Sequence, residues 1–117
     1  MPTNESRSLP EFALASERQG ACHRLDVSGE LDLATAPALE RELMRVEQTS
    51  VRSIVVDLAH VTFMDSTGVH LLSRADRRSR ANGSRLHLTP APPPVRRVLS
   101  LVGSTLADTR PLPEPAG

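Results

Sequence analysis

Hydrophobic residues change their spacing along the chain, and each change predicts a different element of secondary structure. Apolar side chains alternate with polar or small ones around residues 12–14 and 25–27, which predicts two strands joined as a hairpin at Gly20. The apolar run at residues 54–58 predicts a buried strand, and alternation at residues 86–88 predicts a further one. These segments supply the strands of a small sheet.

Three other stretches carry apolar residues at the spacing of an amphipathic helix. Pro37 fits the first turn of the first helix, Asn82-Gly83 tolerates the left-handed conformation that ends the second, and Pro94 can open the third. A short closing strand is expected near Leu106. The apolar stripes are Ala36, Leu39, Leu43 and Val46; Gly68, Leu71, Leu72, Ala75 and Ser79; and Val95, Val98, Leu99 and Val102.

After the opening hairpin the elements alternate between strand and helix, which predicts a single α/β domain over residues 11–109. Strands joined through a helix run parallel and hairpin strands run antiparallel, so we expect a mixed β-sheet flanked by helices. Residues 1–10 are polar and contain two prolines, and residues 110–117 contain three. These ends are predicted to be a flexible arm and a disordered proline-rich tail.

The segment Phe63-Met64-Asp65-Ser66-Thr67-Gly68-Val69 lies where the buried strand must turn into the second helix. Asp65 is expected to be the N-cap, its carboxylate accepting backbone N–H groups, and this leaves Ser66 in the first helical turn. The positive end of the helix dipole favours negative charge there. An exposed hydroxyl at Ser66 is therefore a natural place for a phosphate.

Four segments of the chain, taken in order, resemble the STAS domain of anti-sigma factor antagonists. Together they span roughly residues 20 to 103. The segment around Ser66 alone is weak evidence, but four segments in the family order make a strong match. They are Gly29-Glu30-Leu31-Asp32 with Thr35, Val56-Asp57-Leu58, Phe63-Met64-Asp65-Ser66-Thr67-Gly68, and Pro94-Val95-Arg96-Arg97-Val98-Leu99.

The resemblance implies the STAS fold and reversible phosphorylation of Ser66. It also implies that the unphosphorylated domain binds an anti-sigma factor, which then releases its sigma factor. Phosphorylation at Ser66 is expected to abolish binding to the anti-sigma factor. The anti-sigma factor is expected to be the serine kinase itself, of the GHKL ATPase type, and a separate serine phosphatase resets the switch. Glu30 and Asp32 are expected in the loop before the first helix, near the Ser66 end of the domain. The expected partner-binding residues are Glu30, Asp32, Asp65, Ser66, Thr67, Gly68 and His70. The family usually has Gly at the position of His70.

Composition narrows the range of functions. The formal net charge is zero and the chain has no Trp or Tyr, which argues against nucleic acid or a membrane surface as a partner. Cys22 is the only cysteine, so an internal disulfide and a cysteine metal cluster are excluded, and we expect no metal or cofactor. Neither a P-loop nor a kinase glycine-rich loop is present, so the domain is not expected to be an enzyme. With no membrane-spanning run and no signal-peptide pattern, a cytoplasmic protein is expected.

Several other interpretations remain open. Ser66 and His70 are four residues apart on one helix and suggest a hydrolase dyad, but no nucleophile elbow and no third orienting residue accompany them. Gly68 marks a close approach either to the sheet or to a partner. A STAS scaffold or sensor-complex subunit, or a STAS module that binds a small molecule or nucleotide, is the alternative function. The basic cluster of the second helix, which predicts a solvated face first and an acidic partner second, is Arg74, Arg77, Arg78 and Arg80, with Asp76 among them.

Overall fold

The computed structural model describes residues 12–83 and 85–101, and their elements follow the predicted order. The predictions for residues 1–10, for the closing strand near Leu106 and for the tail at residues 110–117 lie outside the described residues. The strands are β1 (Phe12–Gln19), β2 (Cys22–Leu31), β3 (Ser53–Met64) and β4 (Leu86–Leu88), and the helices are α1 (Ala36–Glu47), α2 (Ser66–Ala81) and α3 (Pro93–Leu101).

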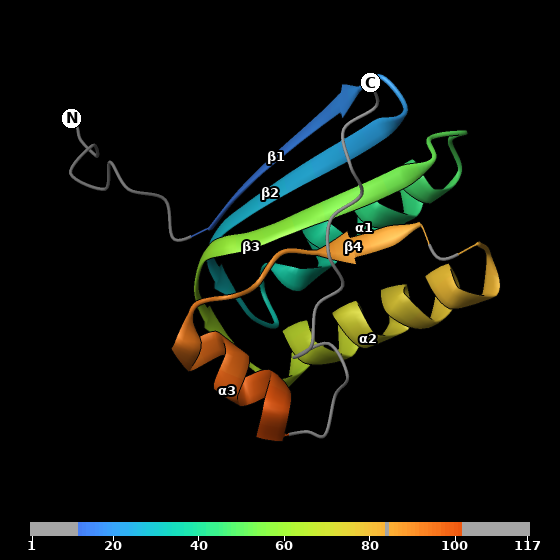
Figure 1. Cartoon of the computed structure of the whole chain (residues 1–117). Coiled ribbons are helices and arrows are strands. Elements are labelled where there is room, and N and C mark those ends of the chain that lie inside the picture. The colour runs from blue at the N-terminus through green and yellow to red at the C-terminus, as the bar shows by residue number, and fades with distance from the viewer. Residues whose placement is uncertain (1–11, 84, 102–117) are drawn as a thin grey trace, which may run out of the picture.

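The four strands form one mixed sheet in the order β1-β2-β3-β4, which confirms the predicted fold class. β1 and β2 are antiparallel and turn at Gly20, whose φ of 64° lies in the left-handed region that glycine adopts readily. β2 pairs with β3, and β3 with β4, in parallel. Since α1 and α2 make the crossovers, β2 and β3 end at one edge of the sheet, where both helices begin (Figure 1).

The helices α1 and α2 lie side by side against the sheet, and α3 packs on β3 near the end where β3 finishes (Figure 1). The stripes predicted for α1 and α2 face the strands and are buried against them, except for Ser79, which is half-buried near the end of α2. This core is aliphatic because the chain has only two Phe and no Trp or Tyr. Its fully buried members include Leu25, Leu31, Leu39, Leu43, Val56, Leu58, Leu71 and Leu72.

The ends of β2 and β3 differ from the prediction. β3 continues beyond residues 54–58 as far as Met64, and Glu30 belongs to β2 rather than to a loop, which corrects our interpretation of the segment around Gly29. The pairing shifts register twice, between Asp26 and Ser28 and again between Gly29 and Glu30. Such bulges interrupt the alternation of apolar and polar residues, so the pattern hides the continuation of both strands.

The helix ends mostly agree with the sequence. Pro37 lies in the first turn of α1, and Asn82 caps α2 before Gly83, whose φ is 97°. The third helix begins at Pro93, one residue before the predicted start. Proline is tolerated there because the first N–H groups of a helix have no acceptor within the helix.

Ion pairs connect the exposed sides of α1 and α2. Arg74 donates to Glu40 through Nε at 3.1 Å and Nη2 at 2.9 Å, and Arg78 donates to Glu47 at 2.9 and 3.0 Å. The hydrogen bonds from Arg74 also lower the pKa of the Glu40 carboxyl. Since α1 supplies the matching acids, the predicted basic face of α2 is largely neutralised and gives little support to an acidic partner.

The histidine of β2 gives stability a defined pH dependence. His23 is only 7% exposed, and its Nε2 lies 2.7 Å from Ser16 Oγ, which donates a hydrogen bond to Glu42. Burial lowers the pKa of His23, and the nearby Arg45 guanidinium lowers it further. The folded domain therefore binds this proton less readily than the unfolded chain, so stability is full above the ordinary pKa of about 6.5 and is lost as pH falls below it.

We therefore expect the melting temperature to fall between about pH 7 and pH 5, and to fall less in a His23→Gln variant. The pKa of Glu42 is lowered to about 2, so this carboxylate does not titrate in the same window. Thermal denaturation monitored by circular dichroism at a series of pH values measures both slopes. Equal slopes for the two proteins would contradict the assignment to His23.

Candidate functional site

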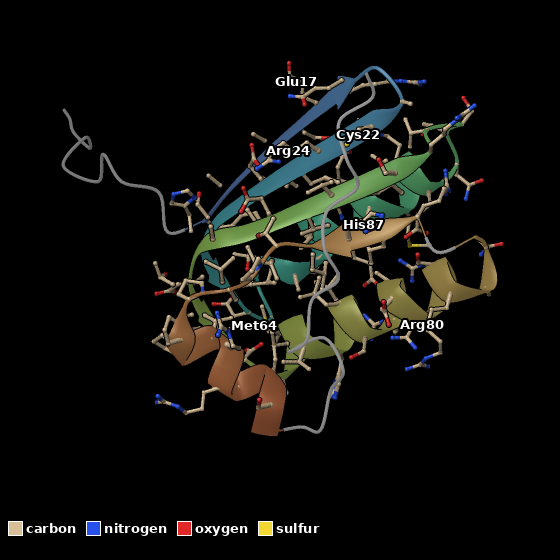
Figure 2. The ribbon with its side chains drawn as sticks, in the orientation of Figure 1. Glu17, Cys22, Arg24, Met64, Arg80 and His87 are labelled. Carbon is tan, nitrogen blue, oxygen red and sulfur yellow. The ribbon has the colours of Figure 1, made fainter. Side chains whose placement is uncertain are left out.

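The carboxyl ends of β2 and β3 meet the first turn of α2 at one end of the domain. The last residue pair of this parallel ladder is Leu31 with Met64, and the N–H of Asp65 donates to the Leu31 carbonyl at 3.3 Å. Met64 lies where β3 approaches the start of α2 (Figure 2). Ser66 therefore begins its helix directly beside the loop that leaves β2.

Asp65 is the N-cap of α2, as predicted. Its Oδ1 accepts hydrogen bonds from the backbone N–H of Thr67 at 2.9 Å and of Gly68 at 3.3 Å. Ser66 follows as the first residue of the helix and is exposed, and in the described part of the chain its hydroxyl has no hydrogen-bond partner. The cap thus presents a free hydroxyl at the positive end of the helix dipole.

Asp32 and Thr35 fix the loop between β2 and α1. The Thr35 hydroxyl donates to the carbonyl of Glu30 at 2.7 Å and accepts from the N–H of Asp32 at 2.9 Å. Asp32 Oδ1 in turn accepts from the N–H of Ala34 at 3.0 Å and of Thr35 at 3.2 Å. Asp32 therefore shapes this loop, which gives it a structural role that the sequence did not reveal.

Gly68 lies on the sheet side of α2, and this answers the question that the sequence left open. It is buried, and a Cβ atom at this position would lie 2.8 Å from Met64 Cγ and 3.0 Å from the Leu31 carbonyl oxygen. Cβ atoms essentially never approach another heavy atom to less than 3.0 Å, so a side chain here would force Met64 to move and would crowd the Leu31 carbonyl. Gly68 therefore allows the first turn of α2, which carries Ser66, to pack closely on the ends of β2 and β3. It presents no side chain to a partner.

His70 is exposed one turn after Ser66. In the described part of the chain it has no hydrogen bond or ion pair, so no bond joins it to the Ser66 hydroxyl. Within the same residues no group of three or more His, Cys, Asp or Glu side chains is placed to hold a metal ion. The arrangement presents a hydroxyl and an imidazole side by side on the surface rather than a nucleophile bonded to its base.

Two exposed apolar side chains at this end of the domain were not singled out from the sequence. Leu33 is 75% exposed in the loop after β2, and Phe63 is 50% exposed near the end of β3. The hydrophobic pattern along the chain does not tell which apolar residues remain uncovered in the fold. Their exposure follows only from what the folded chain packs against them.

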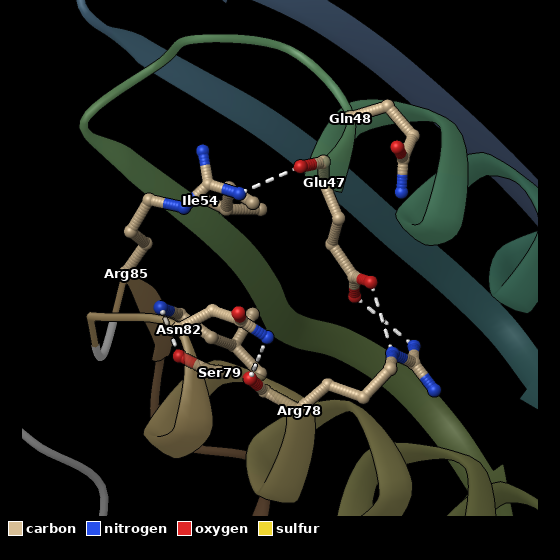
Figure 3. A pocket seen from close by; sticks show the side chains of 8 residues that line it. Glu47, Gln48, Ile54, Arg78, Ser79, Asn82 and Arg85 are labelled. Atoms are coloured by element: carbon tan, nitrogen blue, oxygen red, sulfur yellow. Dashed lines mark hydrogen bonds and ion pairs between the residues drawn. The ribbon is translucent and has the colours of Figure 1, made fainter.

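A pocket of about 330 Å³ lies at the far end of α2, between its last turns and the end of α1 (Figure 3). Its guanidinium groups are already engaged. Arg85 donates to the backbone carbonyls of Glu47, Thr49 and Val51, and Arg78 forms two hydrogen bonds with the Glu47 carboxylate. Since these donors serve the protein itself, the pocket does not favour the alternative of a small-molecule module.

Comparison with known proteins supports the family resemblance. The model of the STAS domain family matches residues 13–106. The chain is 32% identical over 85 residues to an anti-sigma-B factor antagonist of Staphylococcus aureus, covering 73% of this chain and 79% of that protein. An anti-sigma-B factor antagonist from Staphylococcus epidermidis is 31% identical over 81 residues, covering 69% of this chain and 75% of that protein.

Solved structures agree. An anti-sigma factor antagonist from Mycobacterium paratuberculosis is similar with a TM-score of 0.70 and 29% identity, covering 79% of this chain and 78% of that chain. The anti-sigma factor antagonist SpoIIAA in its unphosphorylated form is similar with a TM-score of 0.69 and 26% identity, covering 82% of this chain and 84% of that chain. The phosphorylated form of SpoIIAA, a Bacillus cell fate determinant, is similar with a TM-score of 0.64 and 26% identity, covering 78% of this chain and 84% of that chain.

The chain belongs to the STAS domain family. Within that family it belongs to the anti-sigma factor antagonists, which in general are binding proteins rather than enzymes. Among the helices of the described residues, none is both long and apolar enough to cross a membrane.

Proposed function

We propose that this domain is a partner switch whose state is set by phosphorylation of Ser66. In the unphosphorylated state it binds an anti-sigma factor, which releases its sigma factor, and in the phosphorylated state it dissociates. The observation that carries the proposal is the exposed Ser66 hydroxyl, which has no partner among the described residues and follows the Asp65 cap in the first turn of α2.

The free domain should accept the phosphate without refolding. A phosphoserine brings a charge of about −1.5 to −2, and the N-terminus of a helix favours negative charge. Because the Ser66 side chain is exposed, the added group faces solvent rather than the core. The switch then changes the surface that the partner meets and leaves the fold intact.

The partners follow from the family and from what the sequence lacks. Because the domain carries neither a P-loop nor a kinase glycine-rich loop, the kinase is another protein. The family resemblance implies that this kinase is the anti-sigma factor itself, of the GHKL type. A serine phosphatase resets the switch in the cytoplasm. The similarity to SpoIIAA, which has been solved in unphosphorylated and phosphorylated forms, supports a two-state cycle. The partner surface comprises Glu30, Asp32, Asp65, Ser66, Thr67 and His70 around the supporting Gly68.

We expect incubation with a cognate anti-sigma kinase and ATP to place one phosphate on Ser66. Candidate GHKL kinases from the same genome are mixed with the purified domain, and the products are mapped by peptide mass spectrometry. Thr67 serves as an internal control, because its hydroxyl is only one residue away but a helix turns it by about 100°. Ser66→Ala should receive no phosphate. A phosphate found mainly on Thr67, or none with a kinase shown to bind, would contradict the proposal.

A further inference from the structure

The exposed apolar side chains of this domain are unevenly distributed. Among the described residues three large hydrophobic side chains are exposed, namely Leu33 at 75%, Phe63 at 50% and Met44 at 48%. Leu33 and Phe63 both lie at the end of the sheet that carries Ser66, whereas Met44 lies in the second half of α1. Single exposed apolar residues are ordinary, but two at one candidate site indicate a contact surface.

The strand register places these two residues near Ser66 along the chain path. Leu33 and Ser66 each stand two residues beyond the last pair of the ladder, Leu31 with Met64, and Phe63 stands one residue before it. Two residues span at most about 7 Å and paired strands lie about 5 Å apart, so the Cα atoms of Leu33 and Ser66 are within about 20 Å. A standard protein interface of about 800 Å² per partner is about 30 Å across, which is wide enough to span positions this far apart.

We propose that Leu33 and Phe63 are the apolar anchors that the anti-sigma factor covers with an apolar patch of its own when it binds beside Ser66. This inference rests on the proposed function and names the chemistry of its partner surface. Aromatic side chains that become fully desolvated are among the residues that dominate interface energies, and an aliphatic side chain beside them gains free energy when its apolar surface leaves water. In this arrangement Leu33 and Phe63 provide affinity for the anti-sigma factor, and phosphorylation of Ser66 controls its release.

The charge beside the anchors favours a different protein over a second copy of this chain. Glu30 pairs with Phe63 across the ladder, and in the described residues its carboxylate has no hydrogen bond or ion pair. A symmetric dimer built on this patch would bring two such carboxylates together, which is unfavourable. A partner with an apolar centre and a basic group at its rim fits better.

Apolar anchors also explain how a phosphate releases the partner. A phosphate on Ser66 would have to lose its water against the apolar patch that covers Leu33 and Phe63, and an unpaired charge in such a contact is strongly unfavourable. This cost arises from desolvation and not from repulsion by distant charges. Dissolved salt screens distant charges but does not restore water to a covered phosphate.

The test compares Leu33→Ser and Phe63→Ser with Met44→Ser, which removes a side chain as exposed as Phe63 from another part of the surface. Affinity for the anti-sigma factor that phosphorylates Ser66 is measured by titration calorimetry. We expect each anchor variant to bind at least about tenfold more weakly and Met44→Ser to stay within about twofold of the native domain. Melting temperatures identify any variant that loses stability, and Leu33→Ser, at a mostly exposed position, is the safer of the two.

A second measurement examines the phosphorylated domain at an ionic strength of about 1 M, where charges are screened beyond about 3 Å. We expect binding to remain lost, and recovery at high salt would overturn the desolvation account. Normal binding by folded Leu33→Ser and Phe63→Ser, with phosphorylation still controlling the native domain, would overturn the anchors and leave the proposed function standing. Failure of the native domain to bind any such kinase would overturn both. A native dimer that these variants convert to monomers would show that a second copy occupies the patch instead.

Discussion

Phosphorylation of Ser66 is expected to weaken binding to the anti-sigma factor several-hundred-fold. A misplaced, desolvated charge in an interface costs roughly 3 to 4 kcal/mol, and each 1.4 kcal/mol is a factor of ten in the dissociation constant. Ser66→Asp should reproduce part of this loss, about tenfold or more, because aspartate brings one charge and no phosphate bulk. The fold should be unaffected, since an acid is welcome in the first turn of α2.

Ser66→Ala separates the hydroxyl from the charge. It should bind the anti-sigma factor about as tightly as the native domain and should never be released by incubation with ATP. Circular dichroism and calorimetry on the three proteins give fold and affinity together. If Ser66→Asp is folded and binds as tightly as the native domain, charge at this position does not control partner binding. That result would contradict the proposed phosphorylation switch.

The parts of the site that could be predicted are those in which the chemistry is local in sequence. Asp65 was expected to cap α2, and its Oδ1 does accept the N–H groups of Thr67 and Gly68. Short-range rules suffice here because the two N–H donors lie only two and three residues after the capping carboxylate. The order of strands and helices is predictable for the same reason, because each element has its own apolar period.

Pairings between distant segments could not be predicted in this way. Arg74 meets Glu40 across 34 positions, so a charge count along α2 alone predicts a surface more basic than the one that forms. Glu30 was placed in a loop because bulges in β2 and β3 interrupt their alternation. The exposure of Leu33 depends on packing that no single segment encodes. A resemblance to a family predicts which residue accepts the phosphate, whereas the surface around that residue requires the fold.

The site is also a junction on which the fold depends, and Gly68 connects the two roles. Gly68→Val is expected to lower the free energy of unfolding by about 3 kcal/mol, because a branched side chain would enter space already held by Met64 and by the Leu31 carbonyl. That carbonyl also accepts the N–H of Asp65, so the collision falls on the bond that joins β2 to the start of α2.

Gly68→Ala is the sharper comparison, since two effects oppose each other. Alanine improves helix propensity by about 1 kcal/mol, but its Cβ would lie 2.8 Å from Met64 Cγ and 3.0 Å from a backbone oxygen that cannot turn away. Overpacking costs about 1 to 3 kcal/mol, so we expect a net loss of about 1 kcal/mol. Thr67→Ala, in the same turn but rotated by about 100° from Gly68, should change stability by no more than about 0.5 kcal/mol. Urea denaturation measures all three variants, and a Gly68→Ala domain as stable as the native one would show that α2 approaches the sheet less closely than this geometry requires.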